Sequence, residues 1–130
     1  KYPVKSPPRA RTELHWWLLI AQDARGRIWL QRRPLAGVWP GLFCPPAFDS
    51  LAMLERVAAV GAAPNALKAL PVLRHAMTHR ELLMHPMRLT LPAGLPAHVA
   101  EADGGEWLER LQWTQLGLPA PIRTLLDSLI

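Results

Sequence analysis

The chain has 130 residues, half of them hydrophobic and 19% charged, and it contains a single cysteine. This composition is typical of a globular domain with its own core and excludes a disordered chain. One cysteine also excludes an internal disulfide framework and any four-cysteine metal or iron–sulfur site within the chain. The longest strongly apolar run, residues 16–21, is too short to cross a bilayer. We therefore expect a cytoplasmic protein without a membrane partner.

The formal net charge of +5 is unevenly distributed along the chain. Residues 1–48 hold eight Lys and Arg against two acidic residues, which gives a net charge of +6. Residues 49–130 hold seven basic and eight acidic residues, which gives −1. A basic half suits a polyanionic partner, although an ordinary solvated surface explains a charge of this size about equally well.

The first residues are basic and rich in proline. Residues 1–13 contain Pro3, Pro7 and Pro8 among four Lys and Arg. Because proline fixes φ and removes a backbone donor, we predict that residues 1–13 form an extended interdomain connector and that residues 14–130 form the domain. The absence of an initiator methionine favours a piece of a longer protein.

A β-hairpin is expected after the connector. Residues 14–21 are β-prone and mostly apolar, as a central strand should be. Residues 27–31 alternate, with Ile28 and Leu30 on one face. The turn-forming residues 23–26 lie between these two runs, so the two strands are predicted to pair directly.

The rest of the chain alternates between broken and periodic segments. Residues 34–46 contain too many Gly and Pro for regular structure. Further elements are predicted by local pattern: a helix capped by Ser50 and ending near residue 61, strands over 68–77 and 81–91 with a short link at Thr78 and His79, and a helix over 121–130 with Pro121 in its first turn. The pattern at residues 108–111 does not decide between helix and strand. The element order predicts an α/β domain with a mixed β-sheet and packed helices.

Three stretches carry a family signature when they are taken in order. They are Gln31-Arg32-Arg33-Pro34 with Gly37, Trp39, Gly41-Leu42-Phe43 and Pro46; then Arg74-His75-Ala76-Met77-Thr78-His79; then Trp107 with Leu116-Gly117-Leu118-Pro119-Ala120-Pro121. Together they resemble the C-terminal domain of the MutY-type adenine DNA glycosylases, over nearly the whole chain. Two positions depart from the family pattern: Met77 stands where a phenylalanine is usual, and Pro40 replaces the first glycine of a pair.

The resemblance implies a Nudix-like fold and a role in base excision repair. It implies that the chain binds double-stranded DNA containing 8-oxoguanine opposite adenine, while the adenine enters the catalytic domain of the same protein. In that family the catalytic domain also carries a [4Fe–4S] cluster. The chain itself is therefore expected to be a non-catalytic recognition domain with no cofactor and no metal of its own.

The resemblance also suggests which residues read the lesion. 8-Oxoguanine presents a donor at N7 and a carbonyl oxygen at C8, and one hydroxyl group can satisfy both, because it donates one hydrogen bond and accepts two. Thr78 keeps the hydroxyl of the family motif and is the predicted lesion contact. The full set of predicted DNA-binding residues is Met77, Thr78, His79, Arg74, Arg80, Arg32 and Arg33. Trp39 and Phe43 are expected to anchor their loop in the core.

Two other function classes are alternatives to DNA recognition. A Nudix hydrolase of oxidised nucleoside triphosphates needs several glutamates on one helix to hold Mg²⁺, and the helix expected near residues 50–61 offers Glu55 alone. A protein-docking module would use apolar surface and Trp113 to bind a partner. A cysteine nucleophile is disfavoured because Cys44 has no activating context, and a zinc site at His75 and His79 lacks a third ligand.

Overall fold

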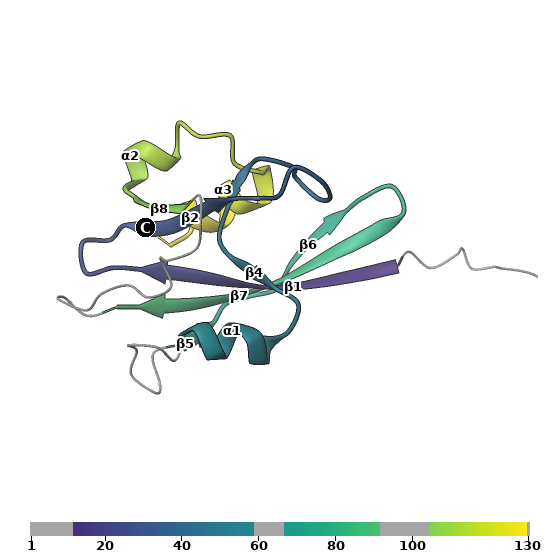
Figure 1. Cartoon of the computed structure of the whole chain (residues 1–130), viewed down its shortest axis with the longest axis horizontal. Coiled ribbons are helices and arrows are strands. Elements are labelled where there is room, and N and C mark those ends of the chain that lie inside the picture. The colour runs from purple at the N-terminus through teal and green to yellow at the C-terminus, as the bar shows by residue number, and fades with distance from the viewer. Residues whose placement is uncertain (1–11, 59–66, 92–104, 130) are drawn as a thin grey trace, which may run out of the picture.

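The computed structural model describes residues 12–58, 67–91 and 105–129. Its eight described strands form one sheet with helices on both faces (Figure 1). In chain order the elements are β1 (Thr12–Gln22), β2 (Ile28–Arg32), β3 (Phe43–Cys44), β4 (Ala47–Phe48), α1 (Leu51–Ala58), β5 (Leu67–Ala69), β6 (Leu73–Ala76), β7 (Arg80–Thr90), β8 (Gly105–Leu108), α2 (Arg110–Trp113) and α3 (Ala120–Asp127). The predicted mixed sheet with packed helices is confirmed.

A long parallel pair forms the centre of the sheet. β1 and β7 pair in register from Thr12 opposite Arg80 to Gln22 opposite Thr90. The neighbours of this pair are antiparallel: β2 pairs with β1, and β5 and β6 both pair with β7. β8 extends the sheet beyond β2. The sheet is mixed because only the central pair runs parallel.

The predicted β1–β2 hairpin is confirmed, and Asp23 explains its turn. The carboxylate of Asp23 accepts hydrogen bonds from the backbone N–H groups of Arg25 at 3.0 Å and Arg27 at 2.8 Å. It also pairs with the Nε of Arg27 at 2.7 Å. Aspartate favours turns because its side chain satisfies nearby backbone donors in this way.

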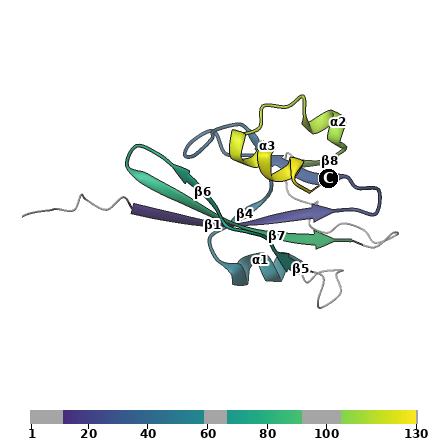
Figure 2. The same ribbon diagram turned by 180° about the vertical axis from the view of Figure 1, so that it is seen from behind.

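Alternation along β1 gives each face of the sheet its own core. Leu18 and Ile20 point toward α3, whereas Leu19 and Ala21 point toward α1, and all four are fully buried. Figures 1 and 2 show α1 on one side of the sheet and α3 on the other. Strands buried on both faces read as continuous apolar runs, which is the pattern that residues 14–21 show.

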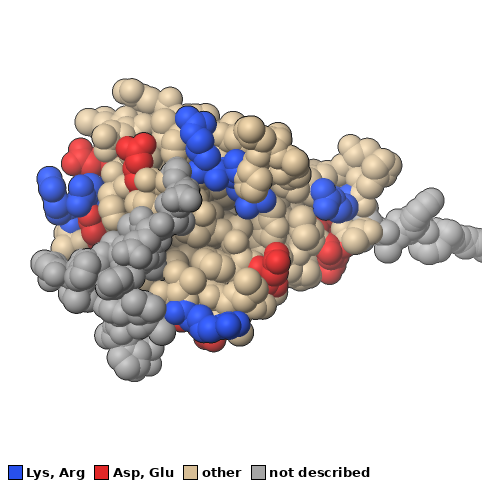
Figure 3. Space-filling model, in the orientation of Figure 1, with Lys and Arg blue, Asp and Glu red and all other residues tan. Residues whose placement is uncertain are grey.

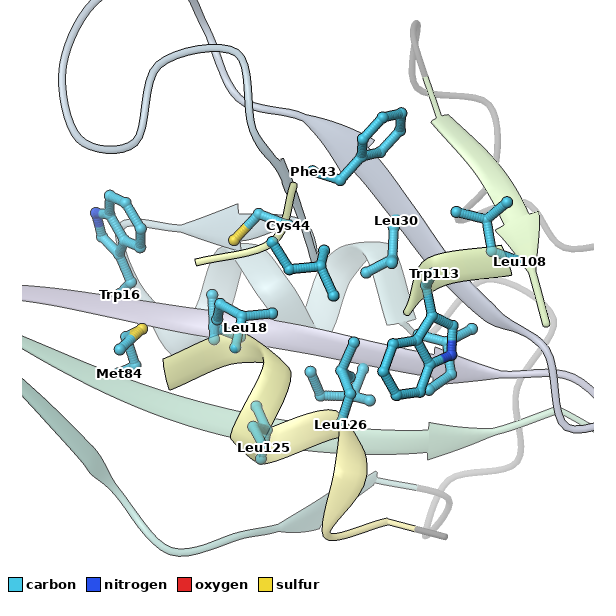
Figure 4. Close-up of a cluster of buried hydrophobic side chains, with 14 of the residues drawn as sticks. Trp16, Leu18, Leu30, Phe43, Cys44, Met84, Leu108, Trp113, Leu125 and Leu126 are labelled. Carbon is cyan, nitrogen blue, oxygen red and sulfur yellow. The ribbon is translucent and has the colours of Figure 1, made fainter. Parts of the chain in front are cut away.

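Trp113 is a core residue, so the idea that it docks a partner is wrong. Its side chain has no exposed area and lies among Leu30, Leu108 and Leu126 (Figure 4). α2 is a short helix between β8 and α3, and it directs this indole into the core on the α3 side. The sequence did not decide the structure here because a single turn of helix has no periodicity to detect.

The predicted strand over residues 68–77 is interrupted. β5 and β6 both pair with β7, but three residues (70–72) lie opposite two (85–86), which is a β-bulge. Pro71 lies in the bulge, and Pro86 on the facing strand has no N–H to donate. Only the Pro86 carbonyl contributes there, accepting the N–H of Leu70 at 2.9 Å. Within sheets, proline is confined to edge strands, to the first residue of a strand and to bulges of this kind.

β3 lies within residues 34–46, where the expectation of no regular structure is wrong, because Phe43 and Cys44 pair with Arg32 and Gln31 of β2. β4 and β8 were not predicted.

The other elements agree with the sequence except at their ends. The hydroxyl of Ser50 accepts the N–H of Met53 at 3.2 Å, so the predicted cap of α1 is confirmed. Pro121 lies in the first turn of α3 as predicted. β1 begins at Thr12, two residues before the predicted start. Residues 1–11 of the connector and the predicted end of the first helix lie outside the described residues. No helix in the described ranges is long and apolar enough to cross a membrane.

Gly105 provides a test of packing in the β2–β8 pair. A Cβ added at Gly105 would overlap the indole ring of Trp29, whereas a Cβ at Gly117 would meet Leu42 at an ordinary 3.5 Å. We expect Gly105→Ala to lower the free energy of unfolding by about 1–3 kcal/mol, because overpacking displaces a buried ring. Gly117→Ala is the matched control and should change it by less than about 1 kcal/mol. Urea denaturation would measure both, and equal effects would contradict the contact.

Candidate nucleic-acid interface

The predicted lesion-reading residues form the tip of the β6–β7 hairpin. The N–H of Met77 donates to the carbonyl of Arg80 at 2.8 Å and closes the turn. Thr78 and His79 between them are exposed, while Met77 is half-buried and packs against the core on the α3 side. Met77 therefore anchors the turn, and the side chains of Thr78 and His79 remain accessible to a ligand.

The loop between β2 and β3 is held by its own backbone. The N–H of Arg33 donates to the carbonyl of Leu42 at 2.8 Å, and the N–H of Leu42 donates to the carbonyl of Trp39 at 3.2 Å. Trp39 adopts a φ of 53°, in the left-handed region that a bulky residue rarely enters. A conformation of this kind persists only where the surroundings fix it.

Aromatic contacts supply that fixation and connect the loop to the hairpin. The ring of Trp39 meets Trp16 of β1 edge-on at 5.8 Å between centroids, and it meets His75 of β6 at 5.3 Å. The guanidinium of Arg33 lies 4.3 Å from the centroid of the Trp16 ring. Phe43 is almost fully buried. The predicted anchoring roles of Trp39 and Phe43 are confirmed, and two of the three sequence motifs meet through the Trp39–His75 contact.

The loop and the hairpin project from the same end of the molecule. This end is on the right in Figure 1 and on the left in Figure 2, and the two views agree. β1 also starts at this end, because its first residue pairs with Arg80 beside the hairpin tip. The loop and the hairpin together make up the candidate surface, which we call the loop–hairpin surface and define as residues 32–42 and 74–80.

The predicted phosphate-binding arginines differ in their availability. The Arg32 guanidinium donates to the carbonyl of Gly41 at 3.1 Å and lies 4.6 Å from the centroid of Phe43, yet the residue is exposed. Arg80 is exposed beside the hairpin tip. Arg74 forms an ion pair with Glu81 at 2.8 Å, which reduces its positive charge toward a ligand. Figure 3 shows Lys and Arg in separate groups on this face rather than in one patch.

A second cluster on the opposite face of the sheet has no counterpart in the sequence analysis. His85 of β7 stacks on Trp17 of β1 at 4.7 Å, and its Nε2 lies 3.0 Å from the Nδ1 of His15. Partial burial lowers the pKa of His85 because it disfavours the charged imidazolium, and electrostatic repulsion from the nearby His15 lowers it further. Only the parallel register of β1 and β7 brings these residues together. Without that register, nothing in the sequence joins His15 to His85.

A comparison with known families adds to this geometry. The family model of the NUDIX domain matches residues 15–128. The chain belongs to the NUDIX domain family. The predicted Nudix-like fold is thereby confirmed, and the match covers every described element from within β1 to α3.

Solved structures with a NUDIX-like fold come from proteins of different function. The C-terminal domain of mouse MUTYH, in complex with human PCNA, has a TM-score of 0.68 at 16% identity, over 87% of this chain and 84% of that one. The NUDIX domain of Shewanella oneidensis NrtR with ADP ribose has 0.65 at 13% identity, over 94% and 89%. The MutT protein of Methanosarcina mazei Go1 has 0.59 at 14% identity, over 91% and 93%. At these identities the likeness shows a shared fold.

Among the residues that the structure describes, α1 does not offer the donors for a hydrolytic Mg²⁺ site. Mg²⁺ requires several oxygen ligands, which hydrolases of this fold take from glutamates on one helix. α1 carries one acidic residue, Glu55, and on its outer side it exposes Leu51 and Met53. Within the described ranges, no group of three or more His, Cys, Asp or Glu residues could hold a metal ion. The residues of α1 therefore do not fit the metal.

Cys44 is equally unsuited to catalysis, and its burial can be measured. The side chain has no exposed area, and burial raises the pKa of the thiol to about 12, although the nearby Arg33 acts in the opposite direction. The thiolate is the reactive form, so at pH 8 the native thiol should be nearly inert. We expect a thiol reagent such as DTNB to modify Cys44 only after unfolding in guanidinium chloride. Rapid modification of the native NUDIX chain would contradict this placement.

Proposed function

We propose that the chain is a DNA-repair recognition domain that reads 8-oxoguanine opposite adenine for an adenine glycosylase. The observation that carries the proposal is the Trp39–His75 contact, which joins the braced loop that follows Arg32 and Arg33 to the hairpin whose tip exposes Thr78. The glycosylase reaction and its [4Fe–4S] cluster would belong to a catalytic domain of the same protein. The chain itself contributes recognition.

Thr78 has the chemistry that the oxidised base requires. Guanine offers an acceptor at N7, whereas 8-oxoguanine offers a donor there and an oxygen at C8. A hydroxyl accepts from the first and donates to the second, so one side chain distinguishes the two bases. His79 is exposed next to it and can hydrogen-bond a base edge or a phosphate, while Met77 fixes the turn from within.

The arginines would supply the affinity that does not depend on sequence. Arg80 and Arg32 are exposed on the loop–hairpin surface and are suited to phosphate oxygens. The predicted Arg33 is less available, because its half-buried guanidinium lies on the Trp16 ring and donates to the carbonyl of Val38. Arg74 contributes less, because its ion pair with Glu81 must be weakened before it can bind a phosphate. Phosphate contacts of this kind release counterions, so the binding should weaken as salt rises.

A second candidate function, protein docking, has a separate surface. A shallow cavity of about 220 Å³ beside α1 is lined by Phe48, Met53, Arg56 and Val57. It replaces the Trp113 surface, which the fold buries. Docking there predicts no preference between duplexes and only a small effect of salt, and both can be measured in the same titrations.

The decisive variant is Thr78→Val, which removes the hydroxyl and keeps the branched shape. We expect the unchanged chain to bind a duplex with 8-oxoguanine:A more tightly than one with G:A, and Thr78→Val to reduce that preference by about 1–3 kcal/mol, the value of one good base-edge contact. Fluorescence-anisotropy titrations at low and moderate salt would measure it. Thr90→Val, at the far end of β7 and also exposed, is the matched control and should retain the preference.

Two outcomes would count against this assignment. Equal affinity of the unchanged chain for both duplexes, with a strong dependence on salt, would reduce the chain to an electrostatic helper. An unchanged preference in Thr78→Val would remove Thr78 from the role of lesion contact, whatever the preference of the chain as a whole.

A further inference from the structure

Leu35 is the most exposed of the large hydrophobic side chains in the described residues. It is 88% exposed and lies in the β2–β3 loop. A single exposed leucine is common on protein surfaces and means little by itself. Leu35 differs from such a residue in three ways: its loop is braced by hydrogen bonds, basic residues precede it, and it belongs to the loop–hairpin surface.

The backbone beside Leu35 is fixed on both sides of the loop. The preceding residue, Pro34, has a restricted φ, and its carbonyl accepts the N–H of Gly41 at 3.2 Å. The carbonyl of Gly41 in turn accepts the Arg32 guanidinium at 3.1 Å. Leu35 lies against Gly41, because a Cβ built on that glycine would be 3.4 Å from the Cδ2 of Leu35. The leucine is therefore presented outward from a braced backbone, so the loop needs little further ordering on binding.

The surroundings of Leu35 are basic as well as braced. Arg32 and Arg33 precede it by three and two residues, and the sequence contains no acidic residue from position 24 to position 48. An apolar tip among cations matches a partner with a polyanionic exterior and an apolar interior. Duplex DNA has this combination, because its phosphates surround a stack of base faces.

The loop also faces the same way as the proposed lesion reader. Trp39, four residues after Leu35, contacts His75 of the hairpin that carries Thr78. Both segments project from one end of the molecule in Figures 1 and 2. A duplex that contacts the hairpin tip is therefore in reach of the loop.

We propose that Leu35 is a wedge that enters the base stack of the duplex beside the 8-oxoguanine:A pair. This inference rests on the proposed function and adds a second contact to it. Apolar side chains that enter a base step unstack it partly, at a cost that is lowest where the pairing is already irregular. Burial of the leucine against the base faces offsets part of that cost. The wedge would therefore favour the mispaired site over regular duplex.

The test uses 2-aminopurine, whose fluorescence rises when it is unstacked, placed next to the 8-oxoguanine:A pair. At saturating concentrations of the unchanged chain, we expect the fluorescence to rise severalfold. Leu35→Ala should abolish most of that rise and weaken the affinity by roughly tenfold, because the buried apolar area is lost. Leu35→Met should retain the rise, since methionine is apolar and adaptable. Circular dichroism would confirm that each variant is folded.

Leu111→Ala is the matched control. Leu111 is 77% exposed and lies on α2, away from the loop–hairpin surface (Figure 1), so its truncation should change neither fluorescence nor affinity. Binding with a preference for 8-oxoguanine:A but without a fluorescence rise would overturn the wedge and leave the proposed function intact. A rise that persists in Leu35→Ala, or is lost equally in Leu111→Ala, would also overturn it. Failure of the unchanged chain to bind either duplex would overturn both proposals.

Discussion

The parallel pairing of β1 with β7 is the constraint on which the rest of the structure depends. The two strands are far apart in sequence, and the chain between them must leave β1 at one end and return to begin β7 at the other. That intervening chain contains both the β2–β3 loop and the β6–β7 hairpin. Because Arg80 pairs with Thr12 at the start of β1, the hairpin tip reaches the same end of the sheet as Trp16, which supports the loop.

At this end of the sheet, side-chain packing fixes the backbone, whereas regular hydrogen bonds between strands fix it elsewhere. The β2–β3 loop has too many Gly and Pro residues for a continuous ladder, and Trp39 adopts a backbone conformation that is unfavourable by itself. Its ring contacts with Trp16 and His75 offset that cost. A loop fixed before binding loses little entropy when a partner arrives, so rigidity contributes directly to affinity. Pro40, which departs from the MutY-type pattern that the sequence resembles, is compatible with this arrangement because the bonds of the loop use other donors.

Local pattern predicted much of the fold, and long-range register accounts for what it missed. The β1–β2 hairpin, the Ser50 cap and Pro121 in α3 follow from neighbours in sequence. The break between β5 and β6 combines a local signal, Pro71, with the register that places Pro86 on the facing strand. At the candidate interface, the sequence pointed to Thr78, which lies at the hairpin tip. The sequence did not predict the Arg74–Glu81 ion pair, because this pair joins the neighbouring strands β6 and β7. Pairing across strands decides such contacts, and residue spacing does not report it.

The fold shows the family of the chain, but it does not by itself show the function. One NUDIX scaffold can support several chemistries, so function has to be argued from the residues placed on it. On α1, the exposed side chains of Leu51 and Met53 are apolar, and Glu55 is the one carboxylate. A single carboxylate supplies too few oxygen ligands for the Mg²⁺ that would bind a triphosphate. At the loop–hairpin end, the same chain presents a hydroxyl, cations and an exposed leucine on braced segments. That combination suits the extended charged and apolar surface of the duplex that we propose as the ligand.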